Sequence, residues 1–357
     1  MTAGGTTAGR HPPVPPLEPP LPPPPARGPG VRGEPAAGAG RAPRFARALL
    51  VVNPASRRGA HFQRRALRAF ARADVSCDVV STAHAGQGAH LAATLAAAYD
   101  VIFTLGGDGT AMEVVGALAG NGGPPVGILP GGTGNLIART LGIPLDVRRA
   151  VPSLLGGVNA SVDLGVLTGA RPGLRRRFAF AAGVGVDATM IADASVTLKR
   201  QLGVGAYVLS WSRAVLRRQA FLARVWVDGE PIERLASAVM VANFGAVLND
   251  LIRLGPGIRQ DDGKLDLCVF SPGTARDAVR VAWKLLRKDF RADPCMLYRA
   301  GRHFRVETDP PRMVQADGEL LGKTPFEIAV EPLAAQLLVP RRWAAAGRAA
   351  GGGGGGE

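Results

Sequence analysis

Two stretches of similar design decide the fold: VIFTLGGDGTAMEVVGAL at residues 101–118 and VGILPGGTGNLIARTL at residues 126–141. Each begins with a short run of apolar residues, which is typical of a strand buried on both faces of a sheet. Each then passes through a glycine-rich turn into a segment with helical spacing of its apolar residues. The repetition of strand, turn and helix predicts a parallel sheet with helices on both faces.

The same alternation extends toward the N-terminus. Apolar runs predict strands at 48–52 and 77–80, and amphipathic spacing predicts helices at 61–73 and 88–98. Together with the strands at 101–105 and 126–129 and the helices at 111–118 and 136–141, they predict an α/β nucleotide-binding domain over residues 44–158.

Beyond residue 158 the pattern changes to short strand-like runs separated by turn signals. The runs lie at 162–167, 178–183, 223–227, 238–242, 265–269, 304–307 and 313–316, with helices expected near 187–219 and 274–289. They predict a β-rich second domain over 159–330. Two last runs, 326–330 and 336–339, close the chain, and we expect residues of about 331–345 to complete the first domain.

Composition limits the function classes. The first 43 residues are rich in Pro and Gly and predict a disordered tail, and residues 346–357 predict a flexible Gly-rich end. Three scattered cysteines argue against a disulfide scaffold or a zinc cluster. No signal-peptide core or apolar run of spanning length is present, so we expect a cytoplasmic protein. A formal charge of +15 favours anionic partners.

The glycine-rich turns predict a phosphate site. Parallel strands end at one edge of a sheet, so both turns should face one crevice. Glycine lets phosphate oxygens reach backbone N–H groups, and a helix N-terminus favours an anion. Thr110, Thr133 and Asn135 can add hydrogen bonds, and Asp108 can bind Mg²⁺. A single turn of this kind would fit an ordinary tight strand-to-helix turn equally well, and the pair at equivalent places favours the phosphate site. Neither turn fits G-x-x-x-x-G-K-[ST], which excludes a Walker loop, and neither fits G-x-G-x-x-G, so the usual dinucleotide site is not indicated.

Six motifs in order resemble the diacylglycerol kinase catalytic-domain family, which includes bacterial soluble lipid kinases and the sphingosine and ceramide kinases. The motifs are Asn53-Pro54-x-Ser56, Gly106-Gly107-Asp108-Gly109-Thr110, Pro130-x-Gly132-Thr133-x-Asn135, Lys199-x-x-Leu202-Gly203-x-x-x-Tyr207, Asp261-Asp262-Gly263-x-Leu265-Asp266 and Asp317-Gly318-Glu319. The resemblance covers residues 46–342 and implies an N-terminal domain of the type shared with NAD kinases and a β-sandwich-like second domain.

The resemblance also implies site residues. ATP would be bound by Asn53, Pro54, Ala55, Ser56, Arg57, Thr82, Gly106, Gly107, Asp108, Gly109, Thr110, Ala111, Met112, Glu113, Gly132, Thr133 and Asn135. A structural Mg²⁺ would be held by the backbone carbonyls of Arg259 and Lys264 and the carboxylate of Asp262. The general base would be Asp317 or Glu319, between which the sequence does not choose. Asp108 would orient the catalytic Mg²⁺.

The chain departs from the family pattern at two positions. Arg57 stands where the family commonly has Gly, which puts the shape of the first nucleotide loop in doubt, and Met112 stands where an Asn is usual. A catalytically silent lipid- or nucleotide-binding regulator is therefore one alternative. An NAD kinase-like enzyme is another, but its adjacent Asn-Glu pair is missing here.

We expect transfer of the γ-phosphoryl group of ATP to a lipid hydroxyl, most simply that of diacylglycerol, giving phosphatidic acid. Such an enzyme must meet its lipid substrate at a membrane surface, as a peripheral protein at the inner face. Contact with anionic phospholipid is predicted at two places. The segment 283–291 mixes apolar and basic residues, and a second apolar segment is flanked by the cations Lys199 and Arg200 and by the Arg-rich stretch 213–218. No nucleic-acid-binding module is indicated. Sphingoid bases and other hydroxylated lipids stay open as acceptors beside diacylglycerol.

Overall fold

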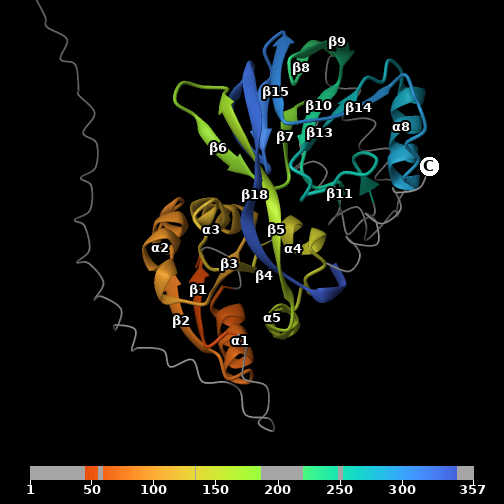
Figure 1. The fold of residues 1–357 in the computed structure, drawn as a ribbon. Helices are drawn as coiled ribbons and strands as arrows, with labels where there is room; N and C mark the ends of the chain where they lie inside the picture. Colours follow the sequence, from red (N-terminus) through yellow and green to blue (C-terminus); the bar gives the residue numbers. More distant parts are fainter. Residues whose placement is uncertain (1–44, 55–58, 133, 186–219, 248–251, 344–357) are drawn as a thin grey trace, which may run out of the picture. The chain divides into compact units, whose positions relative to one another are not determined.

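The computed structural model describes residues 45–54, 59–132, 134–185, 220–247 and 252–343. The predicted tails at 1–43 and 346–357, the helix near 187–219 and the lysine motif at 199–207 lie outside the described residues. Figure 1 shows an N-terminal α/β domain and a second domain built from antiparallel strands. The predicted fold class is confirmed. No helix in the described ranges is long and apolar enough to cross a membrane.

A parallel sheet forms the centre of the first domain. Its strands run in the order β2-β1-β3-β4, with bounds Ser76–Ser81, Arg47–Val52, Val101–Gly106 and Val126–Pro130. Every residue of β3 and β4 is buried, as expected for strands covered on both faces. Because consecutive strands are parallel, the turns after β1, β3 and β4 lie at the same edge of the sheet.

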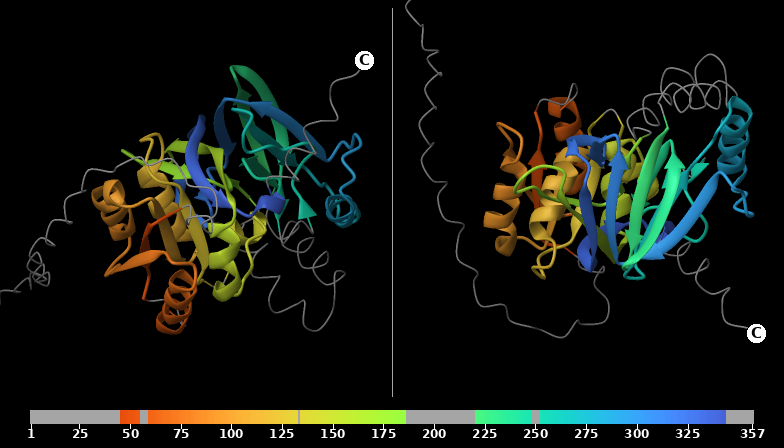
Figure 2. Two further views of the ribbon diagram at one scale, coloured as in Figure 1. Left: turned by 60° about the horizontal axis from the view of Figure 1, so that its bottom comes forward. Right: turned by 90° about the horizontal axis from the view of Figure 1, so that it is seen from above.

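Helices cover both faces of this sheet (Figure 2). On one face α1 (Gly59–Ala71) packs against α5 (Val147–Leu155), and on the other α2 (Gln87–Leu95) packs against α3 (Asp108–Leu118). A short 3₁₀ turn at Ala96–Ala98 extends α2, and α4 (Leu136–Thr140) follows the second glycine-rich turn. The crevice edge therefore receives the N-termini of both α3 and α4.

Two long strands join the domains. β5 (Val158–Gly169) and β18 (Phe326–Val339) pair antiparallel along their whole length, with a register shift between Glu331 and Ala335. The C-terminal part of β18 pairs in parallel with β4, and its N-terminal part pairs with β15 (His303–Asp309). The two expected strands at 326–330 and 336–339 are thus one strand that crosses from domain to domain.

The second domain is a sandwich of two antiparallel layers. One layer continues from β18 through β15 to β8 (Phe221–Val227) and β9 (Glu230–Ala236), and β6 (Arg175–Phe178) pairs with β5. The other layer has the order β14-β13-β10-β7-β16-β17, with bounds Met296–Gly301, Leu265–Phe270, Ala238–Ala242, Ala181–Val184, Met313–Ala316 and Glu319–Lys323. Buried side chains from both layers, such as Phe178, Phe304 and Val314, form its core. The short pair β11 (Ala246–Val247) and β12 (Ile252–Arg253) and helix α8 (Ala275–Arg287) lie outside these layers.

Several local expectations were wrong. The single strand expected at 178–183 is two strands, because the chain bends at 179–180, where its N–H groups turn to the carboxylate of Asp317. Helix α5 was not expected. Its start is capped by Asp146, and its buried residues Val147, Ala150, Val151 and Leu154 have helical spacing. The strands β9, β14 and β17 were also missed, because each exposes much of its surface and lacks a continuous apolar run.

Candidate active site

The two glycine-rich turns are packed backbone against backbone. The N–H of Gly131 donates to the carbonyl of Gly106 at 3.0 Å. A Cβ at Gly131 would lie 2.9 Å from the nitrogen of Gly106, and one at Gly132 would lie 2.6 Å from the Cα of Gly107. Distances this short to backbone atoms are forbidden. Glycine at 131 and 132 is therefore required for the two turns to meet.

Asp108 links the first turn to the helix after the second. Its Oδ1 accepts a hydrogen bond from the N–H of Ile137 at 3.0 Å, in the first turn of α4. Its Oδ2 accepts no hydrogen bond from the described residues, and a Cβ at Gly134 would lie 3.3 Å from it. Asp108 is also the first residue of α3, where the helix dipole stabilises a negative charge. One oxygen thus positions α4, and the other is available to a cation.

Side chains from β1 and α3 close the deep side of the first turn. The amide of Asn53 donates to the hydroxyl of Thr110 at 3.1 Å, and Thr110 is buried. Thr82 is buried against the end of β1, with its hydroxyl 3.5 Å from the carbonyl of Val52. Gly109, by contrast, is exposed, and a Cβ placed there would meet no atom within 4 Å. The open approach to the turn is therefore at Gly109.

Some predicted ATP ligands are engaged in holding the turns. Asn135 has a positive φ of 49°, and its amide bonds both ways with the backbone of Gly132, at 2.9 and 2.8 Å. The carboxylate of Glu113 accepts the N–H groups of Gly86 at 2.8 Å and Gly88 at 3.1 Å, at the start of α2. These two side chains shape the loops around the site.

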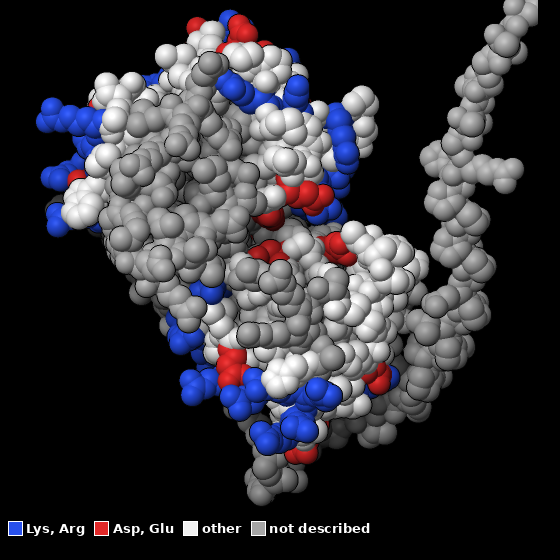
Figure 3. Space-filling model, turned by 180° about the vertical axis from the view of Figure 1, so that it is seen from behind, with Lys and Arg blue, Asp and Glu red and all other residues white. Residues whose placement is uncertain are grey.

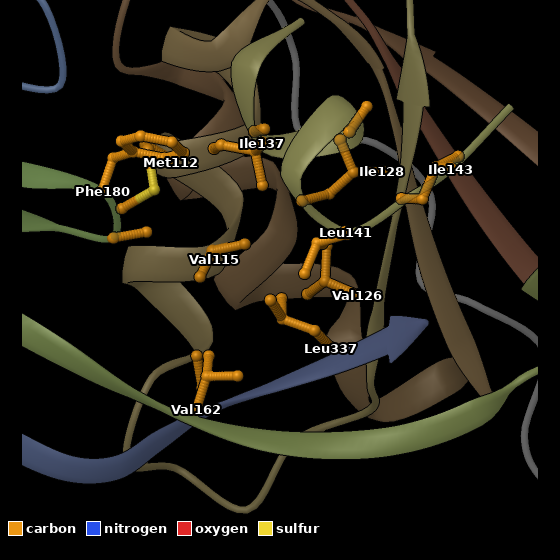
Figure 4. Close-up of a cluster of buried hydrophobic side chains, with 14 of the residues drawn as sticks. Met112, Val115, Val126, Ile128, Ile137, Leu141, Ile143, Val162, Phe180 and Leu337 are labelled. Atoms are coloured by element: carbon orange, nitrogen blue, oxygen red, sulfur yellow. The ribbon is translucent and has the colours of Figure 1, made fainter. Parts of the chain in front are cut away.

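Met112, at the position where the family usually has Asn, is buried in the core. Its side chain is 5% exposed and belongs to the larger cluster of buried apolar residues. Figure 4 shows it beside Phe180 and near Ile137. It lies between α3 and the segment at 179–181, where a polar side chain would be buried among apolar neighbours. Its neighbour Ala111 is buried as well.

Of five further predicted ATP ligands, the structure describes only one. Pro54 is exposed at the end of β1. Ala55, Ser56, Arg57 and Thr133 lie outside the described residues, and so does the local shape of the first nucleotide loop.

Asp317 occupies the turn between β16 and β17 and points back to β7. It has a positive φ of 48°, and its carboxylate accepts three backbone N–H groups: Ala179 at 2.8 Å, Phe180 at 2.9 Å and Ala181 at 3.1 Å. Burial raises the pKa of Asp317 to about 6, the three hydrogen bonds act in the opposite direction, and the negative charge of Asp108 adds to the rise. The charge of Asp108 in the first domain therefore acts on the carboxylate of Asp317 in the second.

Glu319 has a different setting from Asp317. Its side chain is 57% exposed and forms an ion pair with Arg176, at 2.6 Å between Oε2 and Nη2. Figure 3 shows acidic side chains on both sides of the hollow between the domains. The structure thus separates the two candidates for the general base: Asp317 is fixed by the backbone, whereas Glu319 lies at the surface and is paired.

The loop expected to bind the structural Mg²⁺ is a turn that closes on itself. Arg259 pairs with Asp261 at 3.1 Å, and Oδ1 of Asp262 accepts the N–H of Lys264 at 3.0 Å. Within the described ranges no group of three or more His, Cys, Asp or Glu side chains is arranged to hold a metal ion. The ligand set predicted from the sequence has only one carboxylate and two backbone carbonyls, so it is not a cluster of this type.

Sequence reasoning missed two buried polar residues that tie this loop to the site. Asp163 on β5 is 0% exposed and accepts the N–H groups of Gly263 at 2.8 Å and Leu333 at 2.7 Å. Burial raises the pKa of Asp163, against the effect of these hydrogen bonds. The amide of Asn243 donates to the carbonyls of Asp163 at 2.7 Å and Ala179 at 2.9 Å. A lone acid inside an apolar strand was the signal for Asp163, because such a group is buried only when it is hydrogen-bonded.

Comparison with known protein families matches both domains. The diacylglycerol kinase catalytic domain matches residues 47–167, and the YegS C-terminal NAD kinase beta sandwich-like domain matches residues 180–339. The crystal structure of a Bacillus anthracis protein, described provisionally as a diacylglycerol kinase, superposes with a TM-score of 0.67 and 26% identity. The match covers 83% of this chain and 98% of that one.

Curated relatives agree with this match. The diacylglycerol kinase of Bacillus subtilis is 29% identical over 286 residues, which are 79% of this chain and 92% of that protein. A Staphylococcus epidermidis protein, described provisionally as a lipid kinase, is 30% identical over 255 residues, 67% of this chain and 76% of that protein. An uncharacterized Synechocystis protein is 33% identical over 243 residues, 67% of this chain but only 54% of that longer protein.

Proposed function

Since the chain belongs to the diacylglycerol kinase catalytic-domain family, a family of lipid kinases, we propose that it transfers the γ-phosphoryl group of ATP to the hydroxyl of diacylglycerol. The observation that carries this proposal is the setting of two acids: Asp108 begins α3 at the glycine-rich turns, and Asp317 is held by three backbone N–H groups. Asp108 would face the phosphates from the first domain, and its charge acts on the half-buried Asp317 of the second. Phosphoryl transfer needs this combination of charge neutralisation and a proton acceptor in one crevice.

The glycine-rich turns suit the triphosphate. The N–H groups at the start of α3 have no acceptors within the helix, and Gly109 leaves the approach to them open. The contact between Gly106 and Gly131 fixes the two turns relative to each other before ATP binds. Such preorganised donors stabilise charge that develops on the transferred phosphoryl group.

The residues fit a magnesium ion on the phosphates. Mg²⁺ prefers carboxylate and phosphate oxygens, and Oδ2 of Asp108 accepts no hydrogen bond from the part of the chain that the structure describes. When bound, the ion would neutralise phosphate charge. Asp262, with the carbonyls of Arg259 and Lys264, remains the candidate for a second, structural ion, and Asp163 is positioned to hold that loop through Gly263.

Asp317 is proposed as the general base in preference to Glu319. Its pKa of about 6 keeps it ionised at neutral pH but close enough to the solution pH to exchange protons readily. It would take the proton of the lipid hydroxyl as the hydroxyl oxygen bonds to the γ-phosphorus and the bond to the ADP oxygen breaks. Three backbone donors fix its orientation for this step.

We expect the enzyme to work as a peripheral protein at the inner face of the membrane, with its lipid substrate and anionic phospholipid as partners. On α8, Val279 and Trp283 are one helical turn apart and 44% and 51% exposed. Aromatic side chains of this kind insert at the headgroup level. Changing Trp283→Ser should weaken sedimentation with phospholipid vesicles, and unchanged binding would exclude α8 as the contact.

The decisive experiment incubates the protein with labelled ATP, Mg²⁺ and a panel of hydroxylated lipids, followed by separation of the products. Labelled phosphatidic acid from diacylglycerol is the expected result. Label in a sphingoid base instead would change the substrate. Label in no lipid would reject the kinase proposal, and label in a nicotinamide dinucleotide would favour the NAD kinase-like alternative.

A further inference from the structure

A groove lined by arginines lies on the first domain, on the helical face formed by α1 and α5. Its volume is about 300 Å³, and its lining includes Arg64, Arg65 and Arg68 of α1, Arg72 directly after the end of α1, and Arg148 of α5. Figure 3 shows Lys and Arg gathered at the lower end of the molecule, at the height of α1 in Figure 1. None of these residues belongs to the candidate active site.

Helical spacing gathers the charges of α1 into one stripe. Arg64 and Arg65 lie four and three residues before Arg68. Arg72 follows the end of α1, and its N–H donates to the carbonyl of Arg68 at 3.2 Å, which continues the helical turn, so these side chains are neighbours. The opposite side of the helix is buried through Ala66 and Phe70. Like charges at this spacing destabilise a helix. The stripe therefore gains stability from any anion that binds across it.

The groove has little internal compensation for its charge. Arg148 pairs with Asp146 at 2.8 Å. No carboxylate among the described residues lies within ion-pair distance of Arg64, Arg65, Arg68 or Arg72. The contrast with α8 is clear, because there Arg280 and Lys284 both pair with Asp293, and Arg291 pairs with Asp289.

We propose that the α1–α5 groove binds the phosphate group of an anionic phospholipid. Guanidinium groups bind phosphate through paired N–H donors. From Arg64 to Arg72 the stripe is about 12 Å long at 1.5 Å per residue, which suits one or two headgroups and is short for the ~34 Å turn of a nucleic-acid duplex. The choice of a lipid as the source of the phosphate rests on the proposed function, because a kinase acting on a membrane lipid works among such headgroups.

Sedimentation of the full-length protein with vesicles tests this proposal without ATP. The probe is phosphatidylcholine with and without phosphatidylglycerol, and the variant combines Arg64→Gln, Arg68→Gln and Arg72→Gln. Gln has nearly the helix propensity of Arg, so α1 should persist, as an unchanged melting curve would verify. Each basic residue near an anionic surface strengthens binding by roughly fivefold, so loss of three should lower binding to the anionic vesicles by at least about tenfold.

A matched control removes the same charge elsewhere, through Arg171→Gln, Arg299→Gln and Arg302→Gln. These residues are exposed and form no ion pair within the described structure. The control should lose much less binding than the groove variant. Equal losses would show an effect of net charge alone and overturn the proposal.

Two further arms identify the source of the phosphate. If pyrophosphate or duplex DNA binds the wild type and not the groove variant, while both proteins bind vesicles equally, the groove takes a soluble polyanion and the lipid assignment is wrong. Phosphorylation of a short-chain, water-soluble diacylglycerol should be unchanged in the groove variant. Failure of the kinase proposal would remove that activity from the wild type itself, so the two failures are distinguishable.

Discussion

The carboxylate of Asp108 accepts a hydrogen bond from the backbone N–H of Ile137, 3.0 Å away. One residue of the first glycine-rich turn thus holds the helix that follows the second. A substitution at Asp108 will therefore change two things at once, the charge that we propose to face the phosphates and the anchor of α4.

The first prediction separates these two effects. Asp108→Asn keeps an oxygen for the N–H of Ile137 and removes the charge, so its melting temperature should stay near that of the wild type. Its kcat should fall on the order of 10²-fold or more, because a group that stabilises transition-state charge is lost. Asp108→Ala should lose activity and some stability together. Near-normal turnover of the Asn variant would remove Asp108 from the mechanism.

The second prediction ranks the two candidate bases. Asp317→Asn should lower kcat far more than it changes the KM for ATP, whereas Glu319→Gln should alter kcat only slightly, since Glu319 is exposed and paired with Arg176. The side chain of an Asn can accept at one oxygen only, so Asp317→Asn should also melt earlier. Phe180 and Ala181 donate to one oxygen of Asp317 and Ala179 to the other, so one side of this set loses its acceptor. The reverse ranking of kcat would assign the base to Glu319.

The third prediction concerns pH. Because burial raises the pKa of Asp317 to about 6, its basic form accumulates as the pH rises through that value. We expect kcat/KM to rise with pH to about 6 and then to level off. The same shift makes ionisation of Asp317 less favourable in the folded chain than in the unfolded chain. Its contribution to the free energy of unfolding therefore decreases as the pH rises from about 4, near the unperturbed pKa of 3.8, to about 6. A rate profile that is flat across pH 5–7 would contradict the assignment.

The fourth prediction compares two glycines of the turns. Gly132→Ala would place a Cβ 2.6 Å from the Cα of Gly107, and the resulting strain should lower the free energy of unfolding by about 1–3 kcal/mol. Gly109→Ala meets no atom within 4 Å, so the fold should be unaffected while the KM for ATP rises. Calorimetry and steady-state kinetics on the pair measure both effects. If Gly109→Ala binds ATP normally, phosphate does not approach the turn there.

The fifth prediction concerns the second metal site. Mg²⁺ bound at Asp262 and the carbonyls of Arg259 and Lys264 should raise the melting temperature of the wild type, since a ligand stabilises the state that binds it. Asp262→Ala should lose this increase. Asp261→Ala is the matched control, because its carboxylate is engaged by Arg259. If chelation leaves the wild-type melting curve unchanged, the loop holds no structural ion.

Much of the first domain could be predicted because its signals are local. The apolar strands and the glycine-rich turns at 106–109 and 131–134 are each recognised from a few consecutive residues. As a result, β1, β3, α3 and β4 lie within a few residues of the predicted bounds. The second domain was predicted less completely. Partly exposed strands such as β9 and β17 gain their stability from partners distant in sequence, and a local pattern does not record those partners.

The sequence by itself determined the two-domain fold class, the family and the positions of the glycine-rich turns, because these depend on short motifs and on hydrophobic periodicity. The tertiary structure alone decided which of the predicted site residues are buried, which hold loops in place and which are exposed. In the folded chain Met112 is buried beside Phe180. Asn135 and Glu113 form hydrogen bonds that hold loops near the site. Asp317 accepts three backbone N–H groups, whereas Glu319 lies at the surface. The physical reason is that burial, hydrogen bonding and charge coupling are properties of neighbours in space. Asp317 and its donors at 179–181 are about 140 residues apart in the chain, and only folding brings them together.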